Sequence, residues 1–239
     1  MEGGARVDQQ NRTRGAHWGF LAFFVGLGLY HLATLAITAA RSGRPSADPL
    51  ELLDVGPLLL LAFLPTVLLG LPPVLGARRY GERFGVLPTA RDVKVGLACG
   101  AVALVAGYLL NLLLLALYGT DRVSDGPLAD LADNDDDTTL WLALAALVVV
   151  VATPLAEELL VRGALWNALE HHGVPRWVVL VLTAVVFAYL HGEPTRTVAL
   201  VAQGVAIGWA RRRTGRVGAA FVAHAVNNLA PALLLFTDS

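Results

Sequence analysis

Long apolar segments recur along the chain and constrain its fold more than any other feature of the sequence. Seven windows approach the roughly 20 apolar residues that a helix needs to cross the hydrocarbon core of a bilayer. They span residues 18–40, 55–75, 93–118, 139–156, 177–191, 197–210 and 217–236. Because 56% of the residues are hydrophobic and 15% are charged, the chain lacks the polar residues that cover a soluble domain. The sequence therefore predicts an all-α fold, a polytopic transmembrane helical bundle of about seven spans.

The fifth and sixth windows are short, and the segment HGEPTR (191–196) joins them. They could form two spans, or a tight hairpin that stops short of the far surface. The span count therefore ranges from about six to eight.

The distribution of the 18 lysine and arginine residues predicts the orientation of the bundle. With a cytoplasmic N-terminus and sides that alternate at each span, 14 of them lie in the cytoplasm. The acidic loop TDRVSDGPLADLADNDDD lies outside with the remaining four, Arg41, Arg44, Arg122 and Arg196. This bias follows the positive-inside rule and predicts a multi-pass protein, expected in the cell (plasma) membrane.

These features divide the chain into three parts. Residues 1–17 are predicted to form a cytoplasmic tail, residues 18–138 the first three spans with the acidic external loop, and residues 139–239 a membrane core that carries the polar motifs described below. A net charge of −1 argues against nucleic-acid binding. The single cysteine, Cys99, excludes a disulfide framework and a thiolate zinc site within one chain.

Three ionisable residues interrupt the apolar sequence just after the fourth window: Glu157, Glu158 and Arg162. A charge at the centre of a bilayer helix costs about 2.5–3.5 kcal/mol, so such groups are paired or line a wet cavity. Residues four apart share a helix face, which predicts an ion pair between Glu158 and Arg162. Glu157 points about 100° away from Glu158 and is left free. The alternative is that all three side chains snorkel to the cytoplasmic interface.

The same four-residue spacing recurs in two later windows. Phe187 and His191 share a helix face in VVFAYLH, and His224 and Asn228 share one in VAHAVNNL. Each pair places a polar group inside an otherwise apolar helix. This repetition favours a shared polar site over the snorkelling alternative, which stays open.

A predicted hairpin sets the relative depth of these groups. The run from 139 to 170 can continue as one helix, kinked near Pro154, with HHGVP (171–175) as the turn into the next window. When residues are counted along both helices from that turn, Glu157 lies within ~3 Å of His191 along the helix axis. His224, in the last window, lies about 10 Å from the cytoplasmic end of that window. One carboxylate and two imidazoles can therefore meet in a cavity open to the cytoplasm.

Such a cluster suits the hydrolysis of an amide bond, because a base must activate water while hydrogen-bond donors stabilise the oxyanion. The three polar motifs contain no serine or threonine, and Cys99 lies in a different window without a neighbouring histidine. A covalent nucleophile is therefore not favoured.

At these positions the sequence resembles a known family. The motifs Glu157-Glu158-xxx-Arg162, Phe187-xxx-His191 and His224-xxx-Asn228 resemble those of the CPBP family, the CAAX prenyl protease and bacteriocin-processing (Abi) intramembrane proteases. The similarity covers residues 140–236, whereas residues 1–138 match only in being helical membrane spans. The third motif carries asparagine where some members of the family have aspartate.

The resemblance implies a role for each motif residue. Glu157 would activate the attacking water together with His191, while His224 and Asn228 would bind the oxyanion. Three residues would support them: Glu158, Arg162 and Phe187.

The cofactor is left open by the resemblance. The family is often described as metalloproteases, and Glu157, His191 and His224 could bind Zn²⁺ with water as the fourth ligand. The same residues also serve a metal-free glutamate mechanism.

The expected function is therefore that of an intramembrane endopeptidase that cleaves a membrane-associated protein or peptide, prenylated or not. The bilayer and this substrate are its expected partners, nucleic acid is not one, and the oligomeric state is open. One alternative is a non-catalytic scaffold or immunity-type protein that uses the motif residues as a polar helix clamp. A proton-coupled transporter is another, but no inverted repeat supports it.

Several other polar residues are expected to have ordinary roles. His171 and His172 lie in the predicted turn and are expected to be solvated. Arg211, Arg212 and Arg213 are expected to act as topology determinants.

Overall fold

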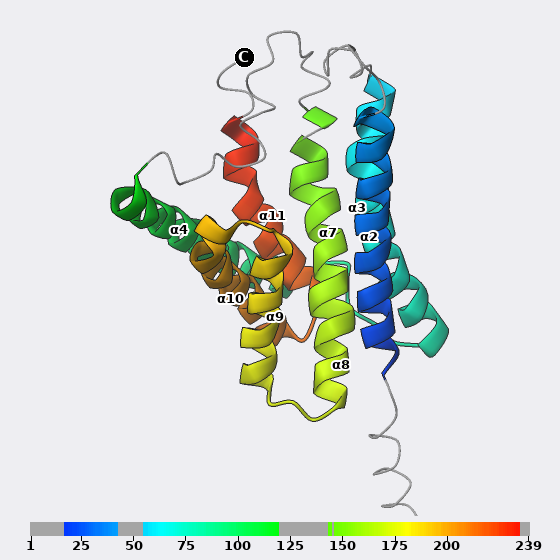
Figure 1. The fold of residues 1–239 in the computed structure, drawn as a ribbon. Helices are drawn as coiled ribbons and strands as arrows, with labels where there is room; N and C mark the ends of the chain where they lie inside the picture. Colours follow the sequence, from blue (N-terminus) through cyan, green and yellow to red (C-terminus); the bar gives the residue numbers. More distant parts are fainter. Residues whose placement is uncertain (1–16, 43–54, 120–142, 145, 235–239) are drawn as a thin grey trace, which may run out of the picture.

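The structure is a computed structural model that describes residues 17–42, 55–119, 143–144 and 146–234. Within these residues all the regular elements are helices, and Figure 1 shows how they are arranged in a bundle. The predicted all-α fold is thus confirmed for this part of the chain. The predicted cytoplasmic tail (1–17), apart from its last residue, and the acidic external loop lie outside the described residues.

The first half of the chain forms three long helices. Helices α2 (Trp18–Ser42) and α3 (Val55–Tyr80) pack against each other, while α4 (Ala90–Tyr118) packs on two helices from the other end of the chain. These are α10 (Thr197–Thr214) and α11 (Val217–Leu234). Glycines in α4 allow the close approach, since a Cβ at Gly96 or Gly100 would lie 2.6 Å from atoms of α11.

The outward faces of these helices are apolar. In the part of the chain that the structure describes, two segments are long and apolar enough to cross a membrane, Trp18–Ile37 and Ala90–Tyr118. Large side chains on them are exposed, for example Leu21 at 69% and Leu117 at 67%. Soluble proteins rarely expose such continuous apolar surface, so this surface fits the predicted membrane protein. The number of spans and the side of the N-terminus remain predictions.

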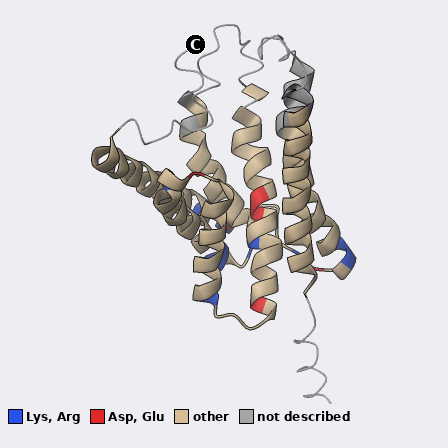
Figure 2. Cartoon of the chain, viewed as in Figure 1, with Lys and Arg blue, Asp and Glu red and all other residues tan. Residues whose placement is uncertain are grey.

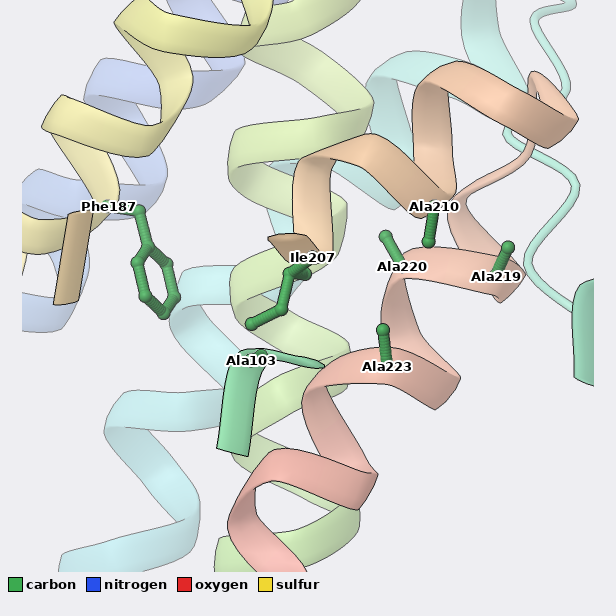
Figure 3. Close-up of a cluster of buried hydrophobic side chains, with 7 residues drawn as sticks. All are labelled: Ala103, Phe187, Ile207, Ala210, Ala219, Ala220 and Ala223. Carbon is green, nitrogen blue, oxygen red and sulfur yellow. The ribbon is translucent and has the colours of Figure 1, made fainter. Parts of the chain in front are cut away.

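Small residues line the core between α4, α10 and α11. Figure 3 shows Phe187 of α9 (Arg176–Leu190) and Ile207 of α10 in one cluster with alanine side chains of the neighbouring helices. The members of this cluster are Ala103, Phe187, Ile207, Ala210, Ala219, Ala220 and Ala223. Because alanine carries no long side chain, these helix backbones can lie close together.

The helix that carries the two adjacent glutamates is composite. Two π-helical segments, η2 (Val148–Ala152) and η3 (Leu159–Leu165), alternate with two α-helical segments, α7 (Thr153–Glu158) and α8 (Trp166–His171). The predicted long helix is therefore confirmed over Val148–His171. Where the sequence predicted a kink near Pro154, the structure has η2 immediately before the proline.

The predicted turn follows this helix. Gly173 adopts a positive φ of 76°, and α9 (Arg176–Leu190) begins three residues later. At 1.5 Å per residue, α9 is about 22 Å long, less than the ~30 Å hydrocarbon core of a bilayer. A short 3₁₀ turn, η4 (Pro194–Arg196), then connects α9 to α10.

The segments predicted to be cytoplasmic come together at one end of the bundle. Arg216, in the turn before α11, pairs with Asp92 at the start of α4 at 2.8 Å. His17, before α2, lies 3.0 Å from Glu82, which follows α3, and its ring contacts that of His171 at the end of α8. Figure 2 shows basic residues near this end and a charged patch at the middle of the α7–α8 helix.

Candidate active site

A fully buried carboxylate lies at the centre of the polar motifs. The Oε1 atom of Glu158 accepts a hydrogen bond from Arg162 Nη1 at 2.9 Å and another from His224 Nδ1 at 3.0 Å. The side chains of Glu158 and Arg162 are both 0% exposed. The predicted pairing of these two residues is thus confirmed, and the first and third motifs meet at one oxygen atom.

Arg162 connects this carboxylate to the second motif. Its Nη2 atom donates to the carbonyl of Gly204 in α10 at 2.9 Å. Its guanidinium group lies over the ring of Phe187 in α9, 4.7 Å from the ring centre. A planar, delocalised cation suits both contacts, since it can donate in its plane and stack on an aromatic face. One arginine therefore joins the helix of the first motif to α9 and α10, while Glu158 makes the bond to the third motif on α11.

The contact with Glu158 fixes the orientation of the His224 ring. A carboxylate can only accept hydrogen bonds, so Nδ1 of His224 carries the proton. The other ring nitrogen, Nε2, faces Glu157 and lies 4.0 Å from its Oε2 atom. Burial of His224, whose side chain is 3% exposed, leaves the ring little freedom to turn. Glu158 therefore positions His224 relative to Glu157.

Glu157 differs from its neighbour because neither of its oxygens forms a hydrogen bond within the described residues, whereas Glu158 is bonded through Oε1 and only its Oε2 atom lacks a partner. The Oε2 atom is buried and has no hydrogen-bond partner, while the side chain as a whole is 21% exposed. Buried polar atoms are nearly always hydrogen-bonded, and ordered water commonly supplies the bond where the protein does not. The prediction that one glutamate is held and the other is left free is confirmed.

His191 is oriented by its own helix. The backbone N–H of His191 bonds to the carbonyl of Ala188 at 3.3 Å, so the carbonyl of Phe187 lacks its usual helical donor. His191 Nδ1 takes that place, 2.7 Å from the Phe187 oxygen. In the neutral ring this leaves Nε2 without a proton and able to accept one. The four-residue spacing of this motif therefore lets His191 bond to the carbonyl of Phe187 in its own helix, and this bond fixes the tautomer of the ring.

The ring of Phe187 separates the two imidazoles. Its centre lies 4.5 Å from that of His191 and 5.3 Å from that of His224. Among the described residues, His191 forms no hydrogen bond or ion pair with Glu157. The structure thus brings His191 to the same aromatic ring as His224, but not into direct contact with the carboxylate.

Asn228 is held at both ends of its amide. Its Nδ2 atom donates to the carbonyl of Val149 at 3.1 Å, and its Oδ1 atom accepts from Asn227 at 3.2 Å. One of the two Nδ2 hydrogens remains outside these bonds. Asn228 therefore has a structural contact that the sequence did not predict.

The residues proposed as zinc ligands do not form a metal-binding group as they are placed. No cluster of three histidine, cysteine, aspartate or glutamate side chains suited to a metal ion occurs in the described residues. The Nδ1 atoms of His224 and His191 are already bound to Glu158 and to the carbonyl of Phe187. Both bonds leave the Nε2 atom of each ring available as a ligand atom, and the ion remains a prediction.

Two residues at the edge of the site were not identified from the sequence. Arg211, expected only as a topology determinant, is buried, and its Nε atom donates to the carbonyl of Arg162 at 3.1 Å. Its Nη2 atom donates to Asn167 at 3.0 Å, and Asn167 in turn donates to Glu82 at 2.9 Å. Three consecutive arginines cover about 200° of a helix, so the sequence held a signal that one of them faces the bundle.

The predicted turn histidines also have neighbours. The ring of His171 lies 4.7 Å from that of His17, and the ring of His172 stacks on Phe20 at 5.5 Å. His171 is half-buried, whereas His172 is exposed as expected. The α8–α9 turn therefore packs against the start of α2 instead of projecting freely into solvent.

Comparison with known proteins identifies the region that carries these motifs. A family model described as Type II CAAX prenyl endopeptidase Rce1-like matches residues 139–230. The matched region contains all the motif residues described above, and the match confirms the resemblance predicted from the sequence. None of the curated proteins and none of the solved structures compared with the chain matches it.

Proposed function

We propose that this chain, whose residues 139–230 match the Rce1-like family of Type II CAAX prenyl endopeptidases, is an intramembrane endopeptidase. It hydrolyses a peptide bond with a water molecule activated by Glu157 and His191. The observation that carries the proposal is the free, buried Oε2 atom of Glu157, 4.0 Å from His224 Nε2. A carboxylate oxygen without a protein partner, beside an imidazole that another carboxylate orients, suits general-base chemistry.

The proposed reaction begins with proton transfer. Glu157 accepts a proton from a bound water molecule, and the unprotonated Nε2 atom of His191 helps to orient that water. The hydroxide oxygen forms a bond to the carbonyl carbon of the substrate, whose oxygen becomes an oxyanion. The protonated Glu157 then gives its proton to the amide nitrogen as the C–N bond breaks. The products are a carboxylic acid and an amine.

The oxyanion is proposed to meet hydrogen-bond donors on α11. His224 supplies Nε2–H when its ring is protonated. Asn228, as the resemblance implies, can add its second Nδ2 hydrogen. Removal of one such donor typically costs about 10²–10³ in rate.

The proposed substrate is a membrane-associated protein or peptide. The family description names prenyl endopeptidases, so a prenylated carboxy-terminal peptide is the first substrate to test. The apolar outward faces of the helices would keep its lipid group in the bilayer, while the cleaved bond enters the polar site.

The test is a cleavage assay with purified protein in proteoliposomes. The probes are a prenylated, internally quenched peptide ending in a CAAX sequence and the same peptide without its lipid. Mass spectrometry of the products identifies the cleaved bond. We expect cleavage by the wild-type protein and none by Glu157→Gln. Equal cleavage by both proteins would contradict the proposed role of Glu157, and no cleavage by the wild type would contradict the substrate class.

Metal dependence is a separate question for the same assay. We propose a reaction in which the carboxylate and the imidazoles suffice, while Glu157, His191 and His224 are the residues that would hold Zn²⁺ in a metal-dependent reaction. Zinc analysis of the active protein, with and without a chelator, tests this. Activity lost with the metal and regained on adding Zn²⁺ would contradict the metal-free reaction.

A second candidate function is the polar helix clamp of a non-catalytic protein. The observation that favours it is the complete burial of Glu158 and Arg162, whose bonds join α10 and α11 to the composite helix. A clamp requires Arg162 but not a carboxylate at residue 157. Under this reading, Glu157→Gln leaves function intact.

A further inference from the structure

The glutamate pair lies between two widened stretches of its helix. Segment η2 ends at Ala152, five residues before Glu157, and η3 begins at Leu159, directly after Glu158. A π-helical stretch changes which backbone groups bond to each other, and such stretches are frequent at functional sites. In each of these π-helical segments, one backbone carbonyl accepts a hydrogen bond from a side chain of another helix.

The first such carbonyl belongs to Val149. In an α-helix the N–H of Thr153 would bond to it, but here that N–H bonds to Val148 instead. In the π-helical pattern the next donor would be residue 154, which is proline and has no N–H. Val149 therefore has no intrahelical donor. Asn228 of α11 supplies one at 3.1 Å.

The second carbonyl belongs to Arg162. The N–H of Trp166, which would bond to it in an α-helix, bonds instead to the carbonyls of Val161 and Gly163. The Nε atom of Arg211 donates to the Arg162 carbonyl at 3.1 Å. The rest of the Arg211 fork reaches Asn167 of α8, so one side chain bonds on both sides of the end of η3.

We propose that Asn228 and Arg211 are positioning residues that hold the composite helix in its widened form on either side of Glu157 and Glu158. Changing a widened turn back to an α-helical turn shifts the register of the helix by one residue, which corresponds to a rotation of about 100°. Such a shift next to the glutamates would turn Glu157 away from His224. This inference rests on the proposed function and adds a bracing role for Asn228 to the donor role that the family resemblance implies.

Pro154 offers a direct test. It has no backbone N–H, so the Val149 carbonyl lacks an intrahelical donor, and Asn228 supplies one instead. Replacing it with alanine restores a backbone N–H, so the Val149 carbonyl gains an intrahelical donor and no longer needs Asn228. The variants are Asn228→Ala, Pro154→Ala and the double variant, measured as full-length protein in proteoliposomes with the prenylated CAAX peptide.

We expect Asn228→Ala to lower kcat about 10³-fold with little change in KM, because it removes a proposed oxyanion donor and also releases the Val149 carbonyl. Adding Pro154→Ala should recover about tenfold of that loss, the part due to the released carbonyl, while the lost donor keeps the double variant about 100-fold below wild type. No recovery in the double variant would overturn the bracing role and leave Asn228 as an oxyanion donor alone.

Thermal unfolding of the same variants makes the test independent of peptidase activity. If Pro154→Ala offsets the fall in melting temperature caused by Asn228→Ala, the bracing contact exists even if no substrate is cleaved. If the two falls simply add, the bracing contact is refuted while the proposed peptidase can still stand. Should Asn228→Ala fail to fold, recovery of folded protein in the double variant serves as the same comparison.

Arg211 has a matched control in the next residue. Arg211→Lys keeps the charge but cannot donate to the Arg162 carbonyl and to Asn167 in the same fork geometry. Arg212 is exposed and lies over the ring of Trp209, 4.9 Å from its centre, so Arg212→Lys changes the same residue type outside the site. We expect kcat to fall about tenfold to 100-fold in Arg211→Lys only. Equal activity of the two variants would overturn the role of Arg211.

Discussion

Two glutamate–histidine pairs in this molecule have the same separation and opposite surroundings. Glu82 and His17 meet at the end of the bundle where the basic segments gather, 3.0 Å apart, with side chains that are 29% and 8% exposed. Glu158 and His224 meet inside the bundle, also 3.0 Å apart, with side chains that are 0% and 3% exposed. The distance is the same, although His17 uses its Nε2 atom and His224 its Nδ1 atom, and the two pairs differ most in their surroundings.

The groups around the two pairs differ in charge. Glu82 also accepts hydrogen bonds from the neutral side chains of Trp18 and Asn167, at 2.8 and 2.9 Å. Glu158 instead bonds to a second ion, Arg162. A partly exposed carboxylate can replace a lost partner with water, whereas a fully buried one cannot. The comparison teaches that the inner pair is fixed in place, and that its neighbour Glu157 is the carboxylate without hydrogen bonds for which we propose the reactive role.

Neutralising Glu157 without changing its shape is expected to have the largest effect, and it tests the distinction between the two glutamates directly. In Glu157→Gln we expect peptidase activity to fall by about 10³–10⁴, because the general base is gone. The melting temperature should change little, since the Oε2 atom has no protein partner. The matched control is Glu193→Gln, a glutamate close to His191 that pairs with Arg196 at 2.6 Å. Similar activity in the two variants would refute the distinction between the glutamates.

Removing the cation from the inner pair is expected to have the next largest effect. Arg162→Ala leaves Glu158 buried with a histidine as its remaining partner, and breaking a buried ion pair typically destabilises by about 3–5 kcal/mol. Thermal unfolding in detergent measures this, with the exposed Arg212→Ala as the control. If both variants unfold at the wild-type temperature, the inner pair is not the fixed element described above.

A smaller effect is expected from the histidine that stands apart from the carboxylates. His191→Gln removes the Nε2 acceptor beside Phe187, and we expect kcat to fall about 100-fold. Tyr189→Phe, at a neighbouring side chain that is 82% exposed, controls for general damage to the end of α9. Wild-type kcat in His191→Gln would show that the water is activated without this ring.

The smallest effect should come from the outer pair. Glu82→Gln is expected to destabilise by about 1 kcal/mol, the usual worth of a hydrogen bond at a partly exposed site. Thermal unfolding at about pH 7.5 and pH 5.5 would measure it together with its pH dependence.

The direction of this pH dependence follows from the two pKa values. Burial lowers the pKa of His17 below its usual value, although the charge of Glu82 acts to raise it. Burial alone would raise the pKa of Glu82, but hydrogen bonds from Asn167 and Trp18 and the His17 ring bring it below its usual value. Both groups therefore contribute stability above their usual pKa values that is lost as the pH falls through the lowered ones. Without Glu82, the pKa of His17 should fall further, so Glu82→Gln should lose more stability on acidification than wild type. An unchanged pH dependence would contradict this coupling.

The local geometry of the motifs was predictable because it needs only one helix. Residues four apart share a face, which identified the Glu158–Arg162 pair and grouped Phe187 with His191. The HHGVP turn was equally local, since glycine can adopt the positive φ that such a turn requires. The network from Glu82 through Asn167 to Arg211 was not predictable, because it joins residues that are far apart in the sequence.

The sequence by itself determined the all-helical fold, the three motifs and the division between a held and a free glutamate, because hydrophobicity and helical periodicity act over a few residues. Only the tertiary structure decided which ring nitrogen of His224 faces Glu157, and that Asn228 and Arg211 take carbonyls released by the widened helix. These features depend on partners such as His224 and Glu158, 66 residues apart, whose meeting is set by how the helices pack. In a buried, low-dielectric interior every polar group needs a partner, and only packing decides which group that partner is.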